Sequence, residues 1–337
     1  MTTPGIADKI LRATRAAGKA YTFNESHDRM QAWQTWFQES DEGTILFVVF
    51  YSQACQWSSC LGCNLPAQMS LGHVSYRALM AQIDRLFSDS EVLLRRDSIR
   101  KVIVSNNGSI LDEQTFSSTA LMYLLALLNA HLPQMAALSL ETRVEYVDIA
   151  ELEFIARALA EAETPAQLEL AIGFEAFDDG IRNDVFNKGL SLRAFEEFVK
   201  KVAPYGYRLK CYFMQKPVAG MTDEAAVADI HDGIDYLSDA ADRYGVPINM
   251  HLNPTYVAGG TPLEQEFRQG AYSPPRFEHV VQSVRHAKGK SVSVFVGLSD
   301  EGLAVEGGSF LDYGERSLVE ALEQFNRTKD YEVLDRL

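Results

Sequence analysis

Short apolar runs alternate with longer amphipathic stretches along most of this 337-residue chain. Most of the short runs are apolar without interruption, which is typical of strands buried on both faces of a parallel sheet. We expect strands at 45–51, 101–105, 136–141, 168–173, 207–214, 248–253 and 292–297. Strands that alternate with helices through six units predict an α/β fold, a partial (β/α)6 barrel.

Cap residues and apolar periodicity define the helices between these strands. Ser191 and Thr222 stand at N-cap positions, and Asp223 and Glu224 place carboxylates in the first turn after Thr222. Residues 149–159 repeat apolar side chains at helical spacing. These features predict helices after the third, fourth and fifth strands.

The pattern divides the chain into three parts. We expect an N-terminal helical cover at 1–43, the barrel at 44–290 and a C-terminal strand–helix extension at 291–337. Trp33, Trp36 and Phe37 lie in the cover, and together with the loop from Tyr256 to Tyr272 they are available as a lid over the barrel.

The chain is acidic. Lys and Arg total 31 and Asp and Glu total 46, so the formal net charge is −15, which disfavours binding to nucleic acid or anionic membranes. We interpret the basic stretch Arg95–Lys101 as a solvated helix end. No run approaches the ~18 apolar residues of a membrane helix, and the start of the sequence has no apolar signal segment. We therefore expect a cytoplasmic protein.

Three of the four cysteines, Cys55, Cys60 and Cys63, lie within nine residues directly after the first expected strand. Clustered thiols in a reducing compartment indicate a metal site before disulfides. Structural zinc prefers four ligands in a closed shell, so His73 or Cys211 would have to complete it. Three thiolates instead suit a [4Fe–4S] cluster with one open iron. Buried structural cysteines are the third interpretation.

Polar loops follow the next two strands, at the end of the barrel where such folds carry their chemistry. Asn107, Gly108 and Ser109 form either an ordinary Asn-Gly turn or a loop that binds an amino group. Glu141 and Arg143 form either a solvated corner or a pair that holds an α-amino carboxylate.

Further polar side chains follow the later strands. Glu175 ends the fourth strand and suits the hydroxyl groups of a ribose. Lys216 follows the fifth strand, and Asn253 and Tyr256 follow the sixth. His251, near the end of the same strand, would by itself more often be a core histidine than a functional one.

Several short motifs occur in one order along the chain. They are Asn107-Gly108-Ser109-x-Leu111-Asp112, Glu141-x-Arg143-x-Glu145-Tyr146, Ile172-Gly173-Phe174-Glu175, Asn187-Lys188-Gly189, Lys216-Pro217, Asn253-Pro254-Thr255-x-Val257 and Tyr272-x-Pro274-Pro275. With the cysteine trio, this order resembles the radical S-adenosylmethionine (radical SAM) superfamily, and within it the Elp3/MiaB/NifB-like family of the archaeosine synthase radical subunit. The cysteine spacing is four residues and then two, where that superfamily usually has three and then two. Gly62 stands where an aromatic residue usually precedes the last cysteine.

The resemblance implies that Cys55, Cys60 and Cys63 hold a [4Fe–4S] cluster and that S-adenosylmethionine binds its open iron. It implies reductive cleavage of S-adenosylmethionine to a 5′-deoxyadenosyl radical, which removes a hydrogen atom from the substrate. A reductant such as flavodoxin or ferredoxin would supply the electron.

The resemblance also implies a division of the polar residues between cofactor and substrate. The expected cofactor-binding residues are Asn107, Gly108, Ser109, Glu141 and Arg143 at the methionine end and Glu175 at the ribose. The residues expected to face the substrate are Lys216, His251, Asn253 and Tyr256.

The resemblance leaves the substrate open. The family's known activity acts on a modified tRNA base, whereas the net charge of −15 favours a small molecule or peptide over RNA. A non-enzymatic zinc or iron–sulfur protein is the alternative from another functional class.

Overall fold

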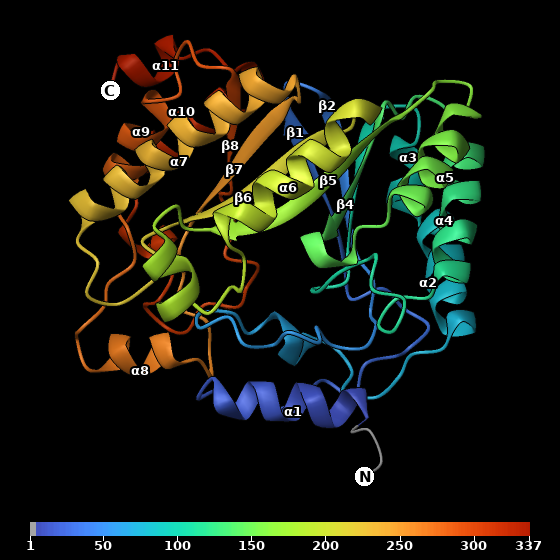
Figure 1. Ribbon diagram of the computed structural model, residues 1–337, viewed down its shortest axis with the longest axis horizontal. Helices are drawn as coiled ribbons and strands as arrows, with labels where there is room; N and C mark the ends of the chain where they lie inside the picture. Colours follow the sequence, from blue (N-terminus) through green and yellow to red (C-terminus); the bar gives the residue numbers. More distant parts are fainter. Residues whose placement is uncertain (1–4) are drawn as a thin grey trace. The chain divides into compact units, whose positions relative to one another are not determined.

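The computed structural model describes residues 5–337, which form an α/β fold with one mostly parallel sheet (Figure 1). Eight strands within these residues follow one another in the sheet in chain order. The strands are β1 (Gln34–Ser40), β2 (Gly43–Val49), β3 (Ile99–Ser105), β4 (Ala137–Thr142), β5 (Gln167–Glu175), β6 (Arg208–Gln215), β7 (Ile248–Pro254) and β8 (Val292–Val296). The α-helices are α1 (Ile6–Ala16), α2 (Tyr76–Ser88), α3 (Ser90–Arg95), α4 (Ser118–His131), α5 (Ile149–Ala160), α6 (Leu192–Val202), α7 (Asp223–Tyr244), α8 (Pro262–Arg268), α9 (Phe277–Arg285), α10 (Arg316–Thr328) and α11 (Glu332–Asp335). The predicted fold class is confirmed.

The chain divides into two compact units. The first comprises residues 22–58, residues 65–171 and the start of the chain up to Ala13, and the second comprises residues 14–21, 59–64 and 172–337. The division passes through β5, between Ala171 and Ile172, and through the cysteine loop, between Ser58 and Ser59.

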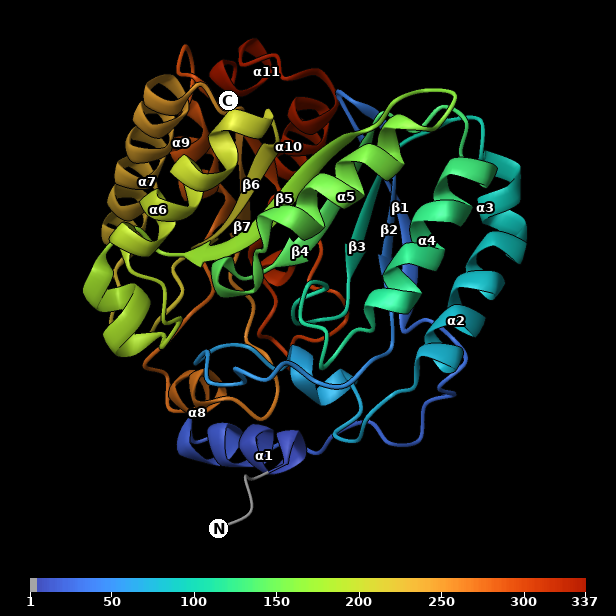
Figure 2. The ribbon, with the colours of Figure 1, turned by 45° about the vertical axis from the view of Figure 1, so that its right-hand side comes forward.

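In the first unit, β1 is antiparallel to β2, and β2, β3 and β4 are parallel neighbours. Ile45 to Val49 of β2 are all buried, as is β3 apart from Arg100. Helices α2, α3, α4 and α5 lie together along one side of these strands (Figures 1 and 2). The uninterrupted apolar runs therefore form strands buried on both faces.

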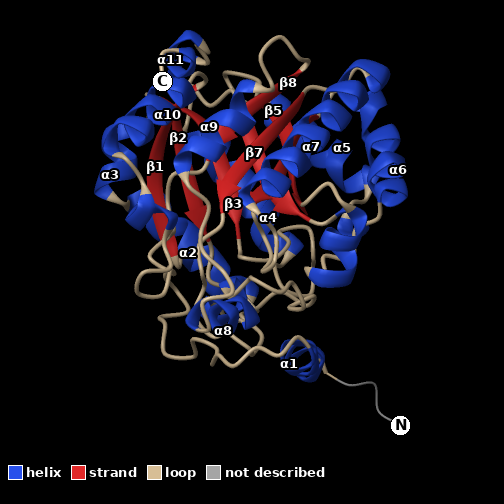
Figure 3. Cartoon of the chain, turned by 90° about the vertical axis from the view of Figure 1, so that its left-hand side faces the viewer, coloured by secondary structure: helices blue, strands red, loops and turns tan. Residues whose placement is uncertain are grey.

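In the second unit, β6, β7 and β8 are parallel neighbours, with Cys211 opposite Met250 and Met250 opposite Val294. These three side chains are fully buried. Gly233 of α7 lies so close to this face that a Cβ atom there would come within 2.7 Å of the Phe213 ring. Figure 3 shows α7 and α9 lying over the strands. One face of β6–β8 is thus an apolar core under helices.

The predicted caps and strands agree with the structure. Each of the seven expected strands overlaps one of β2 to β8. The side chains of Ser191 and Thr222 cap α6 and α7 by accepting hydrogen bonds from the backbone N–H groups of Ala194 and Ala225. None of the helices found in residues 5–337 has the length and apolar character needed to cross a membrane.

The helical prediction for residues 1–43 is wrong beyond α1, because 34–40 form the edge strand β1. A two-residue turn at 41–42 joins β1 to β2, and Gly43 follows it with a φ of +100°. Trp36 stacks on Phe47 across the pair, with ring centroids 4.1 Å apart. Such cross-strand aromatic pairs stabilise a sheet edge, so Trp36 belongs to the sheet and not to a lid. The boundaries of the three expected parts stay a prediction.

The interpretation of Arg95–Lys101 as a solvated helix end holds for Arg95 and Arg96, which are exposed. It is wrong for Lys101, whose side chain is only 3% exposed in β3. The Lys101 ammonium lies 2.8 Å from the Glu169 carboxylate, which is itself fully buried, and 2.9 Å from that of Glu42. Lys101 is buried because it lies within β3, and not on the helix before that strand.

We expect Lys101→Met to lower the free energy of unfolding by about 3–5 kcal/mol, because it leaves the buried Glu169 carboxylate without this ammonium group. The double variant Lys101→Met/Glu169→Leu should regain most of that loss, because it removes both buried charges. Urea unfolding at neutral pH measures both effects. A loss below about 1 kcal/mol in the single variant, the range of surface pairs, would contradict the pairing.

Candidate functional site

The three clustered cysteines lie in the loop after β2, and all three are partly exposed, whereas Cys211 is fully buried in β6. Cys55 belongs to the first unit, and Cys60 and Cys63 belong to the second. Over residues 5–337 the structure does not gather three His, Cys, Asp or Glu side chains that could hold a metal ion. Three thiols on one loop are nevertheless soft donors of the kind that iron–sulfur clusters require, so the donor chemistry fits a cluster.

In the first unit, the Asn-Gly loop after β3 packs directly on Cys55. A Cβ atom at Gly108 would lie 3.3 Å from the Cys55 Cα atom, so a larger residue there would press on the cysteine. The Ser58 hydroxyl donates a hydrogen bond of 2.5 Å to the Cys55 carbonyl. The buried Gln56 amide donates to Asp112 at 2.7 Å, which ties the cysteine loop to the segment after the Asn-Gly loop.

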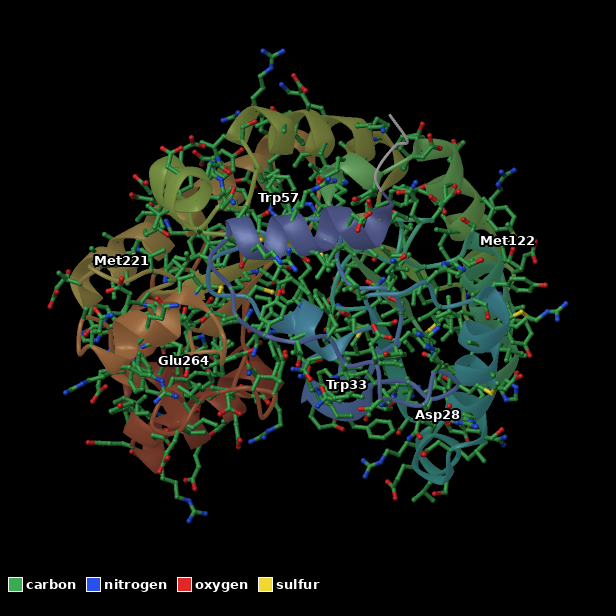
Figure 4. All side chains as sticks on the ribbon, turned by 90° about the horizontal axis from the view of Figure 1, so that it is seen from below. Asp28, Trp33, Trp57, Met122, Met221 and Glu264 are labelled. Atoms are coloured by element: carbon green, nitrogen blue, oxygen red, sulfur yellow. The ribbon has the colours of Figure 1, made fainter. Side chains whose placement is uncertain are left out.

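The residues after β4 lie beside the same loop. The Arg143 guanidinium stands 4.5 Å from the centre of the Trp57 ring, which Figure 4 labels. Arg143 is buried, and its Nε atom is 2.5 Å from Glu145 Oε1. Burial raises the pKa of Tyr146, as do the negative charges of Asp112 and Cys55. The first unit therefore places a cation, a phenol and Cys55 in one neighbourhood.

Glu141 and Ser109 contribute to the connection between the loops. The Ile110 N–H donates a hydrogen bond of 2.9 Å to the Glu141 carbonyl. The hydroxyl groups of Ser109 and Thr142 are 2.7 Å apart. The predicted cofactor-binding residues of the first unit thus lie in two adjoining segments, after β3 and at the end of β4, and the segment after β3 packs on Cys55.

In the second unit, Glu175 ends β5 and forms an ion pair of 2.7 Å with Lys188. Both side chains are mostly buried, with 13% and 12% of their surface exposed. A Cβ atom at Gly173 would collide with the Lys188 ammonium, so glycine leaves the space that this pair needs. The pair holds the Glu175 carboxylate in one orientation at the end of the strand.

Lys216 directly follows β6 and is held from several sides. Its ammonium lies 3.0 Å from Asp223 at the start of α7 and 3.4 Å from the Ser273 hydroxyl. The Tyr272 hydroxyl donates a hydrogen bond of 2.8 Å to the Lys216 carbonyl, and burial raises the pKa of that tyrosine. Lys216 is thus a fixed cation at the end of β6.

His251 and Asn253 lie on the polar face of β6–β8, opposite the apolar core. The ring of His251 lies between those of Tyr212 and Phe295, with each pair of centroids 4.9 Å apart. A Cβ atom at Gly297 would collide with Asn253 Oδ1 and lie 3.2 Å from His251 Nε2. Because its φ is not in the left-handed region, Gly297 is needed for space and not for conformation.

This polar face adds two residues to the candidate site. β6–β8 are not apolar on both faces: side chains at alternate positions are polar or partly exposed. Tyr212 and Phe295 were missed by the sequence reasoning. The signal was present in β7, where Asn249, His251 and Asn253 alternate with apolar residues.

Tyr256 lies beyond the end of β7, near Cys63. Burial raises the pKa of Tyr256 well above its usual value, and the negative charges of Glu301 and Cys63 raise it further. Its hydroxyl therefore stays protonated at neutral pH and can donate a hydrogen bond.

Strained backbone marks the loops after the strands. Ser58, Asn107, Glu175, Lys216 and Glu301 all have positive φ, and they follow or end β2, β3, β5, β6 and β8. Left-handed conformations of non-glycine residues persist only where the surroundings enforce them, and they are typical of binding sites. Of the seven non-glycine residues with positive φ in residues 5–337, these five follow or end strands, whereas Asn187 and Lys329 do not.

Comparison with known proteins identifies distant relatives of this chain. No family model matches the sequence. Archaeosine synthase subunit beta of Methanosarcina acetivorans is 29% identical over 251 residues, which cover 72% of this chain and 66% of the relative. The Thermococcus kodakarensis protein of the same name is 22% identical over 88% of each chain. This chain is a distant homologue of archaeosine synthase subunit beta. It spans just under two thirds of the Methanosarcina relative.

A solved structure confirms the fold. The Methanocaldococcus infernus Elp3 structure matches with a TM-score of 0.52 and 16% identity, over 75% of this chain and 59% of that one. The predicted resemblance to the radical SAM superfamily is therefore confirmed at the level of fold and distant homology. The roles of single residues stay predictions.

The strain at Asn107 can be measured. Its φ is +55°, and we expect Asn107→Ala to lower the free energy of unfolding by about 1 kcal/mol, because a left-handed conformation disfavours alanine. Asn107→Gly should stay close to the parent, because glycine adopts this conformation readily. Equal stability of the Ala and Gly variants in urea unfolding would show that the turn is not strained.

Proposed function

We propose that this chain is a radical SAM enzyme that modifies a nucleoside of tRNA. The observation that carries the proposal is its distant homology to archaeosine synthase subunit beta from two organisms. The cysteine trio after β2 supports it, because three thiols on one loop are donors that suit an iron–sulfur cluster.

We assign the cofactor to the loops after the first strands. A [4Fe–4S] cluster held by Cys55, Cys60 and Cys63 would supply the electron for reductive cleavage of S-adenosylmethionine. Arg143 offers a buried cation for the carboxylate of the methionine moiety, and the backbone around Gly108 offers groups for its amine.

The ribose and the substrate are assigned to the second unit. Glu175, held by Lys188, would accept hydrogen bonds from the ribose hydroxyls. The polar face with Tyr212, His251 and Asn253 would take the substrate, because flat rings and an amide suit a planar heterocycle with hydrogen-bonding edges. Lys216 and Tyr256 complete the substrate side with a cation and a hydroxyl donor.

A small molecule or peptide is the second candidate substrate. The net charge of −15 favours it, because affinity for RNA depends on neutralising phosphates with Lys and Arg. The same chemistry and the same electron donors, such as flavodoxin or ferredoxin, would serve either substrate. The two candidate substrates differ in size: a nucleoside of a folded tRNA must reach the loops after the strands in one case, and a small molecule or peptide in the other.

The cysteine assignment predicts a contrast between two variants. Cys60→Ala should abolish iron retention and cleavage of S-adenosylmethionine, because a cluster left with two thiolates is poorly held. Cys211→Ala should keep both, because Cys211 is buried among apolar residues in β6. Iron analysis after anaerobic reconstitution decides the matter. Loss of iron in Cys211→Ala would mean a fourth protein ligand.

The ribose assignment predicts weaker cofactor binding in Glu175→Ala. Losing a charge-assisted hydrogen bond should raise the dissociation constant for S-adenosylmethionine by an amount that corresponds to roughly 1–3 kcal/mol. The iron content should stay unchanged, and calorimetric titration of the anaerobic protein measures the affinity. Unchanged affinity would move Glu175 to a structural role with Lys188.

The substrate assignment is tested with tRNA. The reduced, anaerobic enzyme is incubated with S-adenosylmethionine and bulk tRNA from a host strain that lacks this chain. We expect a mass change in one nucleoside after digestion of the tRNA, and no change with Cys60→Ala. If only the small-molecule fraction of the same cells stimulates formation of 5′-deoxyadenosine, the second candidate replaces the first.

A further inference from the structure

We infer that Phe186 is a positioning residue for Cys60 and Cys63, because its carbonyl accepts a hydrogen bond from the tip of the turn between them and its ring lies over Gly62. The inference rests on the proposed function only in naming an iron–sulfur cluster as what these cysteines hold. Its structural basis lies wholly within the second unit.

The turn from Cys60 to Cys63 is attached to Phe186 in two ways. The turn is closed by a hydrogen bond of 3.2 Å from the Cys63 N–H to the Cys60 carbonyl. At its tip, the Leu61 N–H donates a hydrogen bond of 2.8 Å to the Phe186 carbonyl. The Phe186 ring then covers Gly62, since a Cβ atom there would lie 3.6 Å from Phe186 Cε2. The carbonyl and the ring of Phe186 thus both contact the turn from Cys60 to Cys63.

The packing at Gly62 has room for a small side chain. Gly62 does not have a left-handed φ, so its backbone would accept other residues. A methyl group at 62 would make ordinary contacts with Phe186 and with Leu263 Cδ2, which is 3.8 Å away. The Phe186 ring therefore lies within contact distance of position 62 without excluding a small side chain there.

Phe186 is itself held rigidly. It follows a π-helical turn, η3 (Gly180–Val185), and its N–H donates 2.8 Å to the Ile181 carbonyl. Arg182 in this turn is fully buried and donates to the carbonyls of Ala176, Phe177 and Leu190 at 2.9, 2.7 and 2.6 Å. Phe186 is only 2% exposed. The segment after β5 is therefore a fixed base for the turn.

This packing should preorganise the thiols of Cys60 and Cys63 for binding iron. A turn fixed at Leu61 and covered at Gly62 loses little freedom when its thiols bind iron, and the ring keeps water from one side of it. Removing the ring should leave both cysteines present but let their side chains reorient. We expect this change on loss of the Phe186 ring and not on a general loss of stability.

The test uses Phe186→Ala, with Phe198→Ala as the matched control. Phe198 is a buried phenylalanine of α6 in the same unit. With the reconstituted protein, we expect Phe186→Ala to lose iron to a chelator about 10–100-fold faster than the parent, the usual penalty for losing support behind metal ligands. With the metal-free chain, iodoacetamide should alkylate Cys60 and Cys63 faster in Phe186→Ala than in Phe198→Ala. Parent-like iron loss and alkylation in Phe186→Ala would overturn the inference.

A control at the turn separates the ring from overall stability. Gly62→Ala should retain iron as the parent does, because a methyl group there makes only ordinary contacts with Phe186 and Leu263. If Phe186→Ala does not fold, Phe186→Leu carries the test, and parent-like iron loss and alkylation in Phe186→Leu contradict the inference. If the parent itself binds no iron, the proposed function fails, and the alkylation rates alone decide on Phe186.

Discussion

Parallel pairing of strands is the constraint on which the site depends. In the first unit β2, β3 and β4 run parallel, and in the second β6, β7 and β8 do so, which brings the carboxyl ends of each set to one edge. Residues far apart in sequence, such as Cys55 and Gly108, then become neighbours. Burial of the apolar faces offsets the free-energy cost of the left-handed backbone at residues such as Lys216 and Glu175.

The net charge favours a small molecule or peptide as the proposed substrate, whereas the homology favours tRNA. The net charge of −15 is a property of the whole surface and sets long-range attraction to RNA. Homology to archaeosine synthase subunit beta is a similarity of sequence over most of the chain. Many basic side chains, including Arg29, Arg193 and Arg316, are already paired with carboxylates of the same chain. These ion pairs reduce the positive charge that is available for phosphates.

The sequence was sufficient for the elements whose signals are local. Ser191 and Thr222 cap their helices as predicted, and the apolar run at Ile45–Val49 is a buried strand. It was not sufficient for β1, because the aromatic residues that suggest a helical cover form a strand only when Phe47 offers a partner to Trp36. Tertiary pairing outweighed the local pattern there.

The candidate site shows the same division. The cysteines and Glu175 were predicted from their positions after or at the end of strands, which is a rule of the fold. The Lys188 partner of Glu175, the ring of Phe186 over Gly62 and the row from Tyr212 to Phe295 depend on contacts between segments. No local pattern encodes such contacts, except the alternation in β7.

The proposed chemistry requires that Cys55, Cys60 and Cys63 hold an iron–sulfur cluster with one iron open to S-adenosylmethionine. Electron paramagnetic resonance of the reduced, reconstituted protein tests this requirement, with spectra taken before and after S-adenosylmethionine is added. A [4Fe–4S]⁺ signal whose g-values change on addition is the result that the proposed chemistry predicts. A cluster signal that S-adenosylmethionine leaves unchanged, or a protein that takes up zinc but no iron, would contradict it.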